Sequence, residues 1–224
     1  QTLSEAIDFL GSMPAKYVAL IGSAVTSLLT DARYLKEGLS FSLSLLFILI
    51  SHEMGHYVAC RLYKVDATLP FFIPTPPMLA PAGTFGAFIK IRSPLPSRRA
   101  VFDIGVAGPI AGFIALIPVA ILGVASMQQA SPEQLASPSG LVFSDPLLMQ
   151  LLAATAGVDL GVSIGNPFYF AAWVGLLVTA LNLIPSGQLD GGHAIFAVFG
   201  ETAHRWTGRI AFGVMTALSI IGWF

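Results

Sequence analysis

Long apolar stretches separated by short polar segments run along the chain, and this pattern predicts membrane-spanning helices. A helix of about 20 apolar residues crosses the hydrocarbon core of a bilayer. The stretches that meet this length are 39–62, 101–127, 167–184 and 206–224. A weaker stretch, 14–30, contains several glycine and hydroxyl residues, so it is a short span, a re-entrant segment or a buried helix. We therefore expect an all-α polytopic membrane protein with about five spans, the first of which depends on how 14–30 folds.

The segment 66–99, between two of these spans, follows a different pattern. Its seven prolines exclude a continuous helix, and the stretches 68–73 and 84–91 are typical of short strands. We expect a small β-hairpin at the membrane interface. One possibility is that the hairpin simply lies at the interface. The other is that it offers an edge strand to which an extended substrate pairs through main-chain hydrogen bonds. The candidate substrate-binding residues of this hairpin are Gly83, Thr84, Phe85 and Gly86.

The composition supports a membrane protein and excludes some partners. Hydrophobic residues make up 55% of the chain and charged residues 10%, and the mean hydropathy is +0.78. A soluble domain has about 25% charged residues. The net charge of −1 and the lack of basic runs argue against a nucleic-acid partner. The single cysteine, Cys60, has no partner for an internal disulfide and is expected to pack within a helix.

The basic residues predict how the chain is oriented in the membrane. If the spans alternate in direction, nine Lys and Arg residues fall on one side and two, Arg33 and Lys36, on the other. The side with more basic residues is expected to be cytoplasmic. The loop 128–165 has acidic but no basic residues, which suits the opposite side. The nine residues of the first group are Lys16, Arg61, Lys64, Lys90, Arg92, Arg98, Arg99, Arg205 and Arg209.

One of the apolar stretches contains the motif His52-Glu53-Met54-Gly55-His56. On a helix, residues four apart lie on one face, so both imidazoles can bind a single ion while Glu53 stands beside them. Zinc is the default ion for such ligands. Two buried histidines that only contact neighbouring helices would leave the adjacent buried carboxylate unexplained. The motif therefore predicts a metal site within the membrane.

A catalytic zinc ion normally has a third protein ligand, which must come from another part of the chain. The best candidate is Asp190, which follows an apolar span interrupted by Pro185 and Gly187. The alternative is that Asp190 only caps a helix. His193 is a less favoured ligand, and His204, between charged neighbours, is expected to be solvated.

Four motifs follow one another along the chain: the His52-Glu53-x-x-His56 helix, the Gly83–Gly86 hairpin, Ala107-Gly108-Pro109, and Asn182 with Pro185 and Leu189-Asp190-Gly191-Gly192. In this order they resemble the site-2 protease family of intramembrane zinc metalloproteases. The proline-rich insert before Gly83 and the run from Phe85 to Pro109 are most similar to the branch of this family that is found in bacteria and chloroplasts and has no PDZ domain. The resemblance implies one zinc ion bound by His52, His56 and Asp190, with Glu53 as the catalytic acid and base. It also implies that Asn182 positions the substrate or its oxyanion.

The resemblance further implies a single transmembrane metalloprotease domain over 1–224. Within it we expect a core at 39–200, the interfacial insert at 66–99 and a non-cytoplasmic loop at 128–165. The chain begins at Gln1 without a signal peptide of the usual pattern, so we expect it to be trimmed at one or both ends.

The expected activity is hydrolysis of a peptide bond within or near the transmembrane helix of a membrane-anchored regulatory protein. The enzyme would sit in a bacterial inner membrane or an equivalent organelle membrane, with the active site towards the cytoplasmic side. A non-enzymatic zinc carrier or sensor would use the same ligands without needing Glu53, and a proteolytically silent membrane chaperone is a further alternative.

Overall fold

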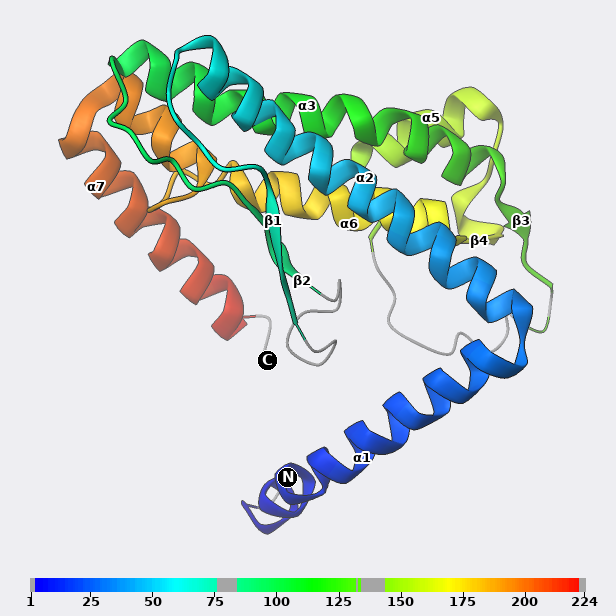
Figure 1. Ribbon diagram of the computed structural model, residues 1–224. Coiled ribbons are helices and arrows are strands. Elements are labelled where there is room, and N and C mark those ends of the chain that lie inside the picture. The colour runs from blue at the N-terminus through cyan, green and yellow to red at the C-terminus, as the bar shows by residue number, and fades with distance from the viewer. Residues whose placement is uncertain (1–2, 76–83, 132, 134–143, 222–224) are drawn as a thin grey trace.

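The computed structural model describes residues 3–75, 84–131, 133 and 144–221, and most of these are helical. Three helices, α2 (Ala32–Leu62), α3 (Arg98–Ala125) and α6 (Pro167–Asn182), lie side by side and form the body of the molecule (Figure 1). The helix α1 (Leu3–Thr30) extends away from this body from the beginning of α2. The short α5 (Leu147–Ala156) packs on α3, and the final helix is α7 (Asp190–Ile221).

Polar side chains define where the three central helices begin. The Asp31 carboxylate accepts a hydrogen bond from the backbone N–H of Arg33, and Ser97 does the same for Ala100. Asn166 accepts from Tyr169 and is followed by Pro167, whose fixed φ suits the first helical position. Each cap pairs an N–H group that the helix itself leaves without a partner.

Small residues allow the central helices to approach closely. Ala171 and Ala172 of α6 are fully buried, as is Leu116 of α3. A Cβ atom on Gly175 would lie 3.1 Å from side-chain atoms of Ile48 and Leu116, so α6 contacts both neighbours at this glycine. Because α2, α3 and α6 are fixed against one another, the polar residues on these helices keep fixed positions relative to each other.

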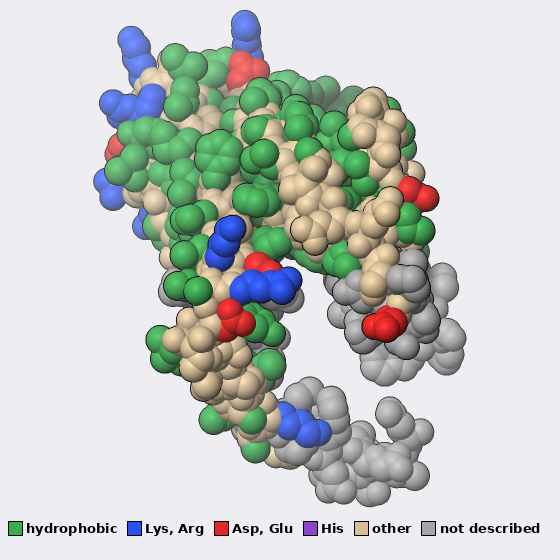
Figure 2. Space-filling view, turned by 90° about the vertical axis from the view of Figure 1, so that its right-hand side faces the viewer, with side chains coloured by type: hydrophobic (Ala, Val, Ile, Leu, Met, Phe, Trp, Pro, Cys, Tyr) green, Lys and Arg blue, Asp and Glu red, His purple; other side chains and the backbone are tan. Residues whose placement is uncertain are grey.

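The structure does not confirm the expected count of about five spans. Within the described part of the chain, two helices are both long and apolar enough to cross a membrane, α2 and α3. The helix α6 has 16 residues and is therefore about 24 Å long, short of the roughly 30 Å of hydrocarbon. The apolar part of α1 is also short, 15–30. Exposed apolar side chains are nevertheless spread over the upper body in Figure 2, as expected of a membrane protein. Several Lys and Arg side chains gather at the upper left of this body, and others lie in the middle and at the bottom of the view.

The predicted hairpin is present between α2 and α3. The strands β1 (Phe71–Pro74) and β2 (Thr84–Phe88) pair in antiparallel fashion, with Phe71 opposite Phe88 and Phe72 opposite Ala87. Both strands are shorter than expected, because beyond the Phe71–Phe88 pair the pairing continues only as an isolated bridge between Ala67 and Ile91. Thr84, Phe85 and Gly86 lie on β2, whereas Gly83 lies outside the described residues.

A second, smaller sheet joins the ends of two helices. It consists of β3 (Gln128–Gln129) and β4 (Ser163–Ile164), which follow α3 and precede α6. A single 3₁₀ turn, Leu160–Val162, leads into β4. The side chain of Asn166 donates to the carbonyl of Gly123 at 2.7 Å and so ties the start of α6 to the end of α3.

Candidate metal centre

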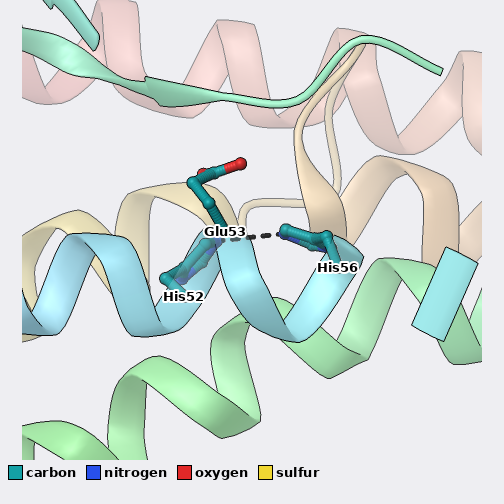
Figure 3. Close-up of side chains that lie close together, drawn as sticks. All are labelled: His52, Glu53 and His56. Atoms are coloured by element: carbon teal, nitrogen blue, oxygen red, sulfur yellow. Dashed lines mark hydrogen bonds between the residues drawn. The ribbon is translucent and has the colours of Figure 1, made fainter. Parts of the chain in front are cut away.

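The two histidines of the motif lie on one face of α2, one turn apart. Their Nε2 atoms are 3.2 Å from each other, and both side chains are buried. The carboxylate of Glu53 points away from the imidazoles towards the strand that crosses above α2, as Figure 3 shows. One ligand atom from each of the three residues lies within 4.8 Å of the others. The helix thus presents two imidazoles and one carboxylate together, as predicted.

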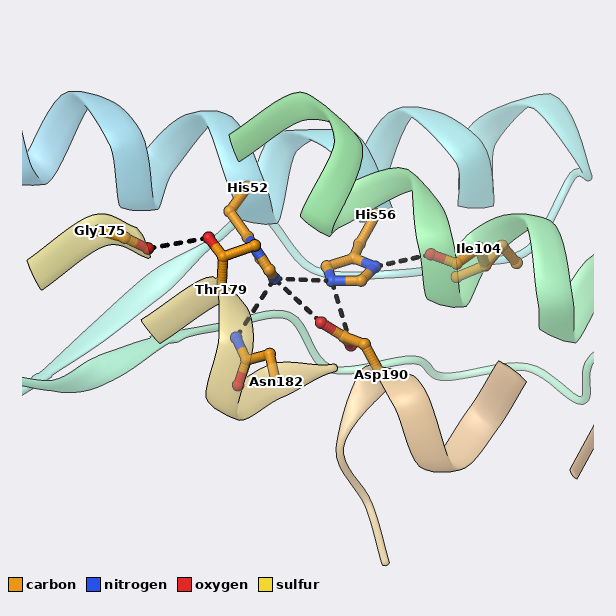
Figure 4. Close-up of polar contacts among 7 residues, drawn as sticks. All are labelled: His52, His56, Ile104, Gly175, Thr179, Asn182 and Asp190. Atoms are coloured by element: carbon orange, nitrogen blue, oxygen red, sulfur yellow. Dashed lines mark hydrogen bonds and ion pairs between the residues drawn. The ribbon is translucent and has the colours of Figure 1, made fainter. Parts of the chain in front are cut away.

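Asp190 reaches the same place from the far end of the chain (Figure 4). Its Oδ2 lies 3.1 Å from Nε2 of His52, and its Oδ1 lies 3.3 Å from Nε2 of His56. Asp190 is the first residue of α7, which begins after the turn that follows α6. Because α6 packs against α2, the end of this turn faces the two histidines.

The spacing of these three ligand groups suits a zinc ion. A tetrahedral zinc ion about 2.0–2.1 Å from each ligand atom separates those atoms by about 3.3 Å. The two Nε2 atoms are 3.2 Å apart, and each lies 3.1 or 3.3 Å from a different carboxylate oxygen of Asp190, which is close to this value. The backbone carbonyl of Ile104 lies 2.7 Å from Nδ1 of His56. Since a carbonyl only accepts, Nδ1 carries the proton and Nε2 keeps its lone pair for a metal. The cluster therefore fits one Zn²⁺.

Glycines of α2 and α3 provide the space for this cluster. A Cβ atom on Gly108 would overlap with the imidazole of His56, and one on Gly112 would lie 3.0 Å from Cβ of His52. A Cβ atom on Gly55 would overlap with the backbone carbonyl of Ala107. The close contact between α2 and α3 and the room for the imidazoles therefore both depend on the absence of side chains.

Asn182, at the last turn of α6, is also near the cluster. Its Nδ2 lies 3.4 Å from Nε2 of His52. One turn earlier, Thr179 donates to the carbonyl of Gly175 within α6 and is buried. The amide of Asn182 is thus beside the ligand atoms without belonging to the trio that surrounds a metal position.

A cavity of about 220 Å³ joins these groups to the hairpin. Its polar lining includes His52, His56, Asp190, Asn182 and Glu53. Its apolar lining includes Ala87 and Phe88 of β2 together with Ile89, Ile91, Leu95 and Val101. The structure therefore brings the predicted metal ligands, the predicted acid and base, Asn182 and part of the predicted strand to one cavity.

Three features of the site have no counterpart in the sequence prediction. The Ile104 carbonyl that orients His56 belongs to the backbone, which carries no sequence signature. The role of Gly112 follows only from the close packing of α3 on α2. The expectation that His204 is solvated is wrong, since it is half-buried and hydrogen-bonded to the carbonyl of Gly192.

Comparison with known proteins agrees with this geometry. The model of Peptidase family M50 matches residues 40–222. A protein of Oryza sativa subsp. japonica named probable zinc metalloprotease EGY1, chloroplastic, is 34% identical over 194 residues, which cover 84% of this chain and 33% of that protein. The Arabidopsis thaliana proteins named probable zinc metalloprotease EGY1 and EGY2, chloroplastic, are 34% and 32% identical over 84% and 89% of the chain. The chain spans about a third of the length of these curated relatives.

Proposed function

The chain belongs to Peptidase family M50, and on this premise we propose that it is an intramembrane zinc endopeptidase. Its substrate would be a membrane-anchored regulatory protein, cut within or near the transmembrane helix. The relatives carry the name of probable zinc metalloproteases, which supports the reaction class. The observation that carries the proposal is the convergence of His52, His56 and Asp190 beside Glu53 in one cavity.

Each residue of the cavity has a defined part in this proposal. His52, His56 and Asp190 would hold a zinc ion, which when bound would supply Lewis acidity towards a water molecule and a substrate carbonyl. The Glu53 carboxylate takes a proton from the attacking water while the water oxygen bonds to the carbonyl carbon of the substrate. It then gives that proton to the amine that leaves when the C–N bond breaks. The Asn182 amide donates to the oxygen that develops negative charge.

The hairpin supplies a means to hold the substrate. A helical substrate hides its carbonyls in internal hydrogen bonds, so a short segment must unwind before it is cut. In the sheet that the described residues form, β2 pairs with β1 along one edge and has a second edge. We infer that the unwound segment pairs with this second edge, where Ala87 and Phe88 border the cavity. Phe85, Thr84 and Gly86 of β2 would extend the same pairing.

The orientation in the membrane is also part of the proposal. The bias of basic residues supports a metal centre that faces the cytoplasmic side, and the membrane would be a bacterial inner membrane or an equivalent organelle membrane. A protease site on that side would release the cytoplasmic part of its substrate.

The experiment is cleavage of a helical transmembrane substrate by the zinc-loaded chain in liposomes, compared with Glu53→Gln. The exchange preserves the size of the side chain and removes its ability to take a proton. We expect zinc binding to be retained and cleavage to be abolished. Undiminished cleavage by Glu53→Gln would contradict the proposal, and zinc flux across the liposome without cleavage would favour a carrier.

A further inference from the structure

The final helix consists of two parts that meet at a sharp bend. Gly200 has φ 82° and ψ −175°, a backbone conformation that glycine alone adopts without strain. The bend is visible in Figure 1, where the end of α7 turns away from its beginning. Arg98 of α3 lies beside the bend, with its guanidinium 6.0 Å from the ring centroid of Phe196. The part after Gly200 is called the distal part of α7 below.

The distal part contacts the segment that carries Asp190. Nδ1 of His204 lies 3.1 Å from the backbone carbonyl of Gly192, which is only two residues from Asp190. Because a carbonyl only accepts, Nδ1 of His204 carries the proton and donates it. The ring of His204 also meets Phe196 edge to face, with centroids 6.1 Å apart. The imidazole is therefore held on two sides.

The start of α7, which His204 contacts, packs tightly against the turn that precedes it. A Cβ atom on Gly191 would overlap with the carbonyl of Leu183, and one on Gly192 would lie 2.5 Å from the carbonyl of Gly187. A Cβ atom on Gly208 of the distal part would lie 3.7 Å from Oγ of Ser186, within the same turn. The turn from 183 to 192 thus lies between the end of α6 and the distal part of α7.

We propose that His204 is a positioning residue for Asp190, which it acts on through the carbonyl of Gly192. The inference rests on the proposed function in one respect, the assignment of Asp190 as a metal ligand. It gives the distal part of α7 a role in the metal centre, although no distal residue lines the cavity. Hydrogen bonds behind a ligand fix its orientation, and their loss typically weakens metal binding by 10–100-fold.

The test compares two substitutions of His204 in the full chain in detergent or nanodiscs. His204→Phe keeps an aromatic ring against Phe196 and removes the donor. In His204→Asn, the side-chain amide nitrogen occupies nearly the place of Nδ1, so this variant restores the donor. Arg205→Gln is the matched control, because Arg205 is exposed and pairs with Glu201 on the helix surface. The measurement is the rate at which a chromogenic chelator removes zinc from the loaded protein.

We expect zinc to leave His204→Phe roughly tenfold faster than the unsubstituted chain. We expect His204→Asn and Arg205→Gln to stay within about twofold of it. Thermal unfolding of the zinc-free proteins separates loss of the fold from loss of the contact, and should be the same for all four. Equal zinc release from all of them would overturn the inference, and so would fast release from His204→Asn.

Asp190→Ala separates this inference from the proposed function. If Asp190→Ala releases zinc as slowly as the unsubstituted chain, the assignment of Asp190 as a ligand fails. If Asp190→Ala releases zinc quickly while His204→Phe does not, the role of His204 alone fails.

Discussion

Asp190 and His52 are 138 positions apart in the sequence, and Oδ2 of the aspartate lies 3.1 Å from Nε2 of the histidine. This contact joins the beginning of α7 to the middle of α2. It exists because α6 packs against α2 and ends beside the histidines, so that the turn after α6 delivers Asp190 to them.

Gly108→Ala should empty the metal centre. The new methyl group would overlap with the imidazole of His56, which must then leave its position. We expect the zinc content per folded molecule to fall at least tenfold, with a corresponding loss of cleavage. Gly213→Ala is the control, because a Cβ atom there has no atom within 4 Å. Full zinc content in Gly108→Ala would show that the close packing of α3 does not shape the site.

Asn182→Ala should slow cleavage without removing zinc. The amide lies beside the ligand atoms, 3.4 Å from Nε2 of His52, where it can donate to a developing oxyanion. Removal of one such donor costs about 10²–10³ in kcat. Zinc content and turnover are measured on the same preparation. If Asn182→Ala lost its zinc, the residue would instead be a support for the metal centre.

The pairing of substrate with β2 predicts a period of two in the substrate backbone. Alternate N–H groups of an extended segment point to the same neighbouring strand. A series of substrates, each methylated at one backbone nitrogen near the cleavage site, should therefore alternate between strongly and weakly reduced kcat/KM. Methylation far from the cleavage site provides the control. A uniform effect along the series would argue against strand pairing.

Asn166 is expected to stabilise the fold without affecting the reaction. It caps α6 and also donates to the carbonyl of Gly123. Asn166→Ala should lower the free energy of unfolding by about 1–2 kcal/mol. Asn166→Asp keeps the capping oxygen and loses the donor, so its effect should be smaller. Turnover per folded molecule should be unchanged in both, since Asn166 does not line the cavity.

The parts of the site that follow from local spacing were predictable. His52 and His56 share a face of any helix, and Glu53 precedes His56 by three residues, so their juxtaposition requires no tertiary information. Asp190 could be proposed because a broken apolar stretch with two glycines marks a close approach of the backbone. The hairpin was also predictable, since its prolines exclude a helix and its strands are apolar.

The parts that depend on packing were not predictable. The carbonyl of Ile104 that orients His56 could have been any backbone group of a neighbouring helix. His204 lies between charged residues in the sequence, but the bend at Gly200 returns it to Gly192, a contact that a straight helix would not make. The span count depended on hydropathy alone, and this does not reveal that α6 ends after 16 residues.

The central claim is that His52, His56 and Asp190 together hold one catalytic zinc ion. It is tested most directly by the zinc-edge X-ray absorption spectrum of the loaded Glu53→Gln variant, measured with and without the further change Asp190→Ala. We expect one zinc ion per chain, with two imidazoles and a carboxylate oxygen at about 2.0–2.2 Å. We also expect the oxygen ligand and most of the zinc to be lost on Asp190→Ala. An unchanged spectrum and zinc content after Asp190→Ala would contradict it.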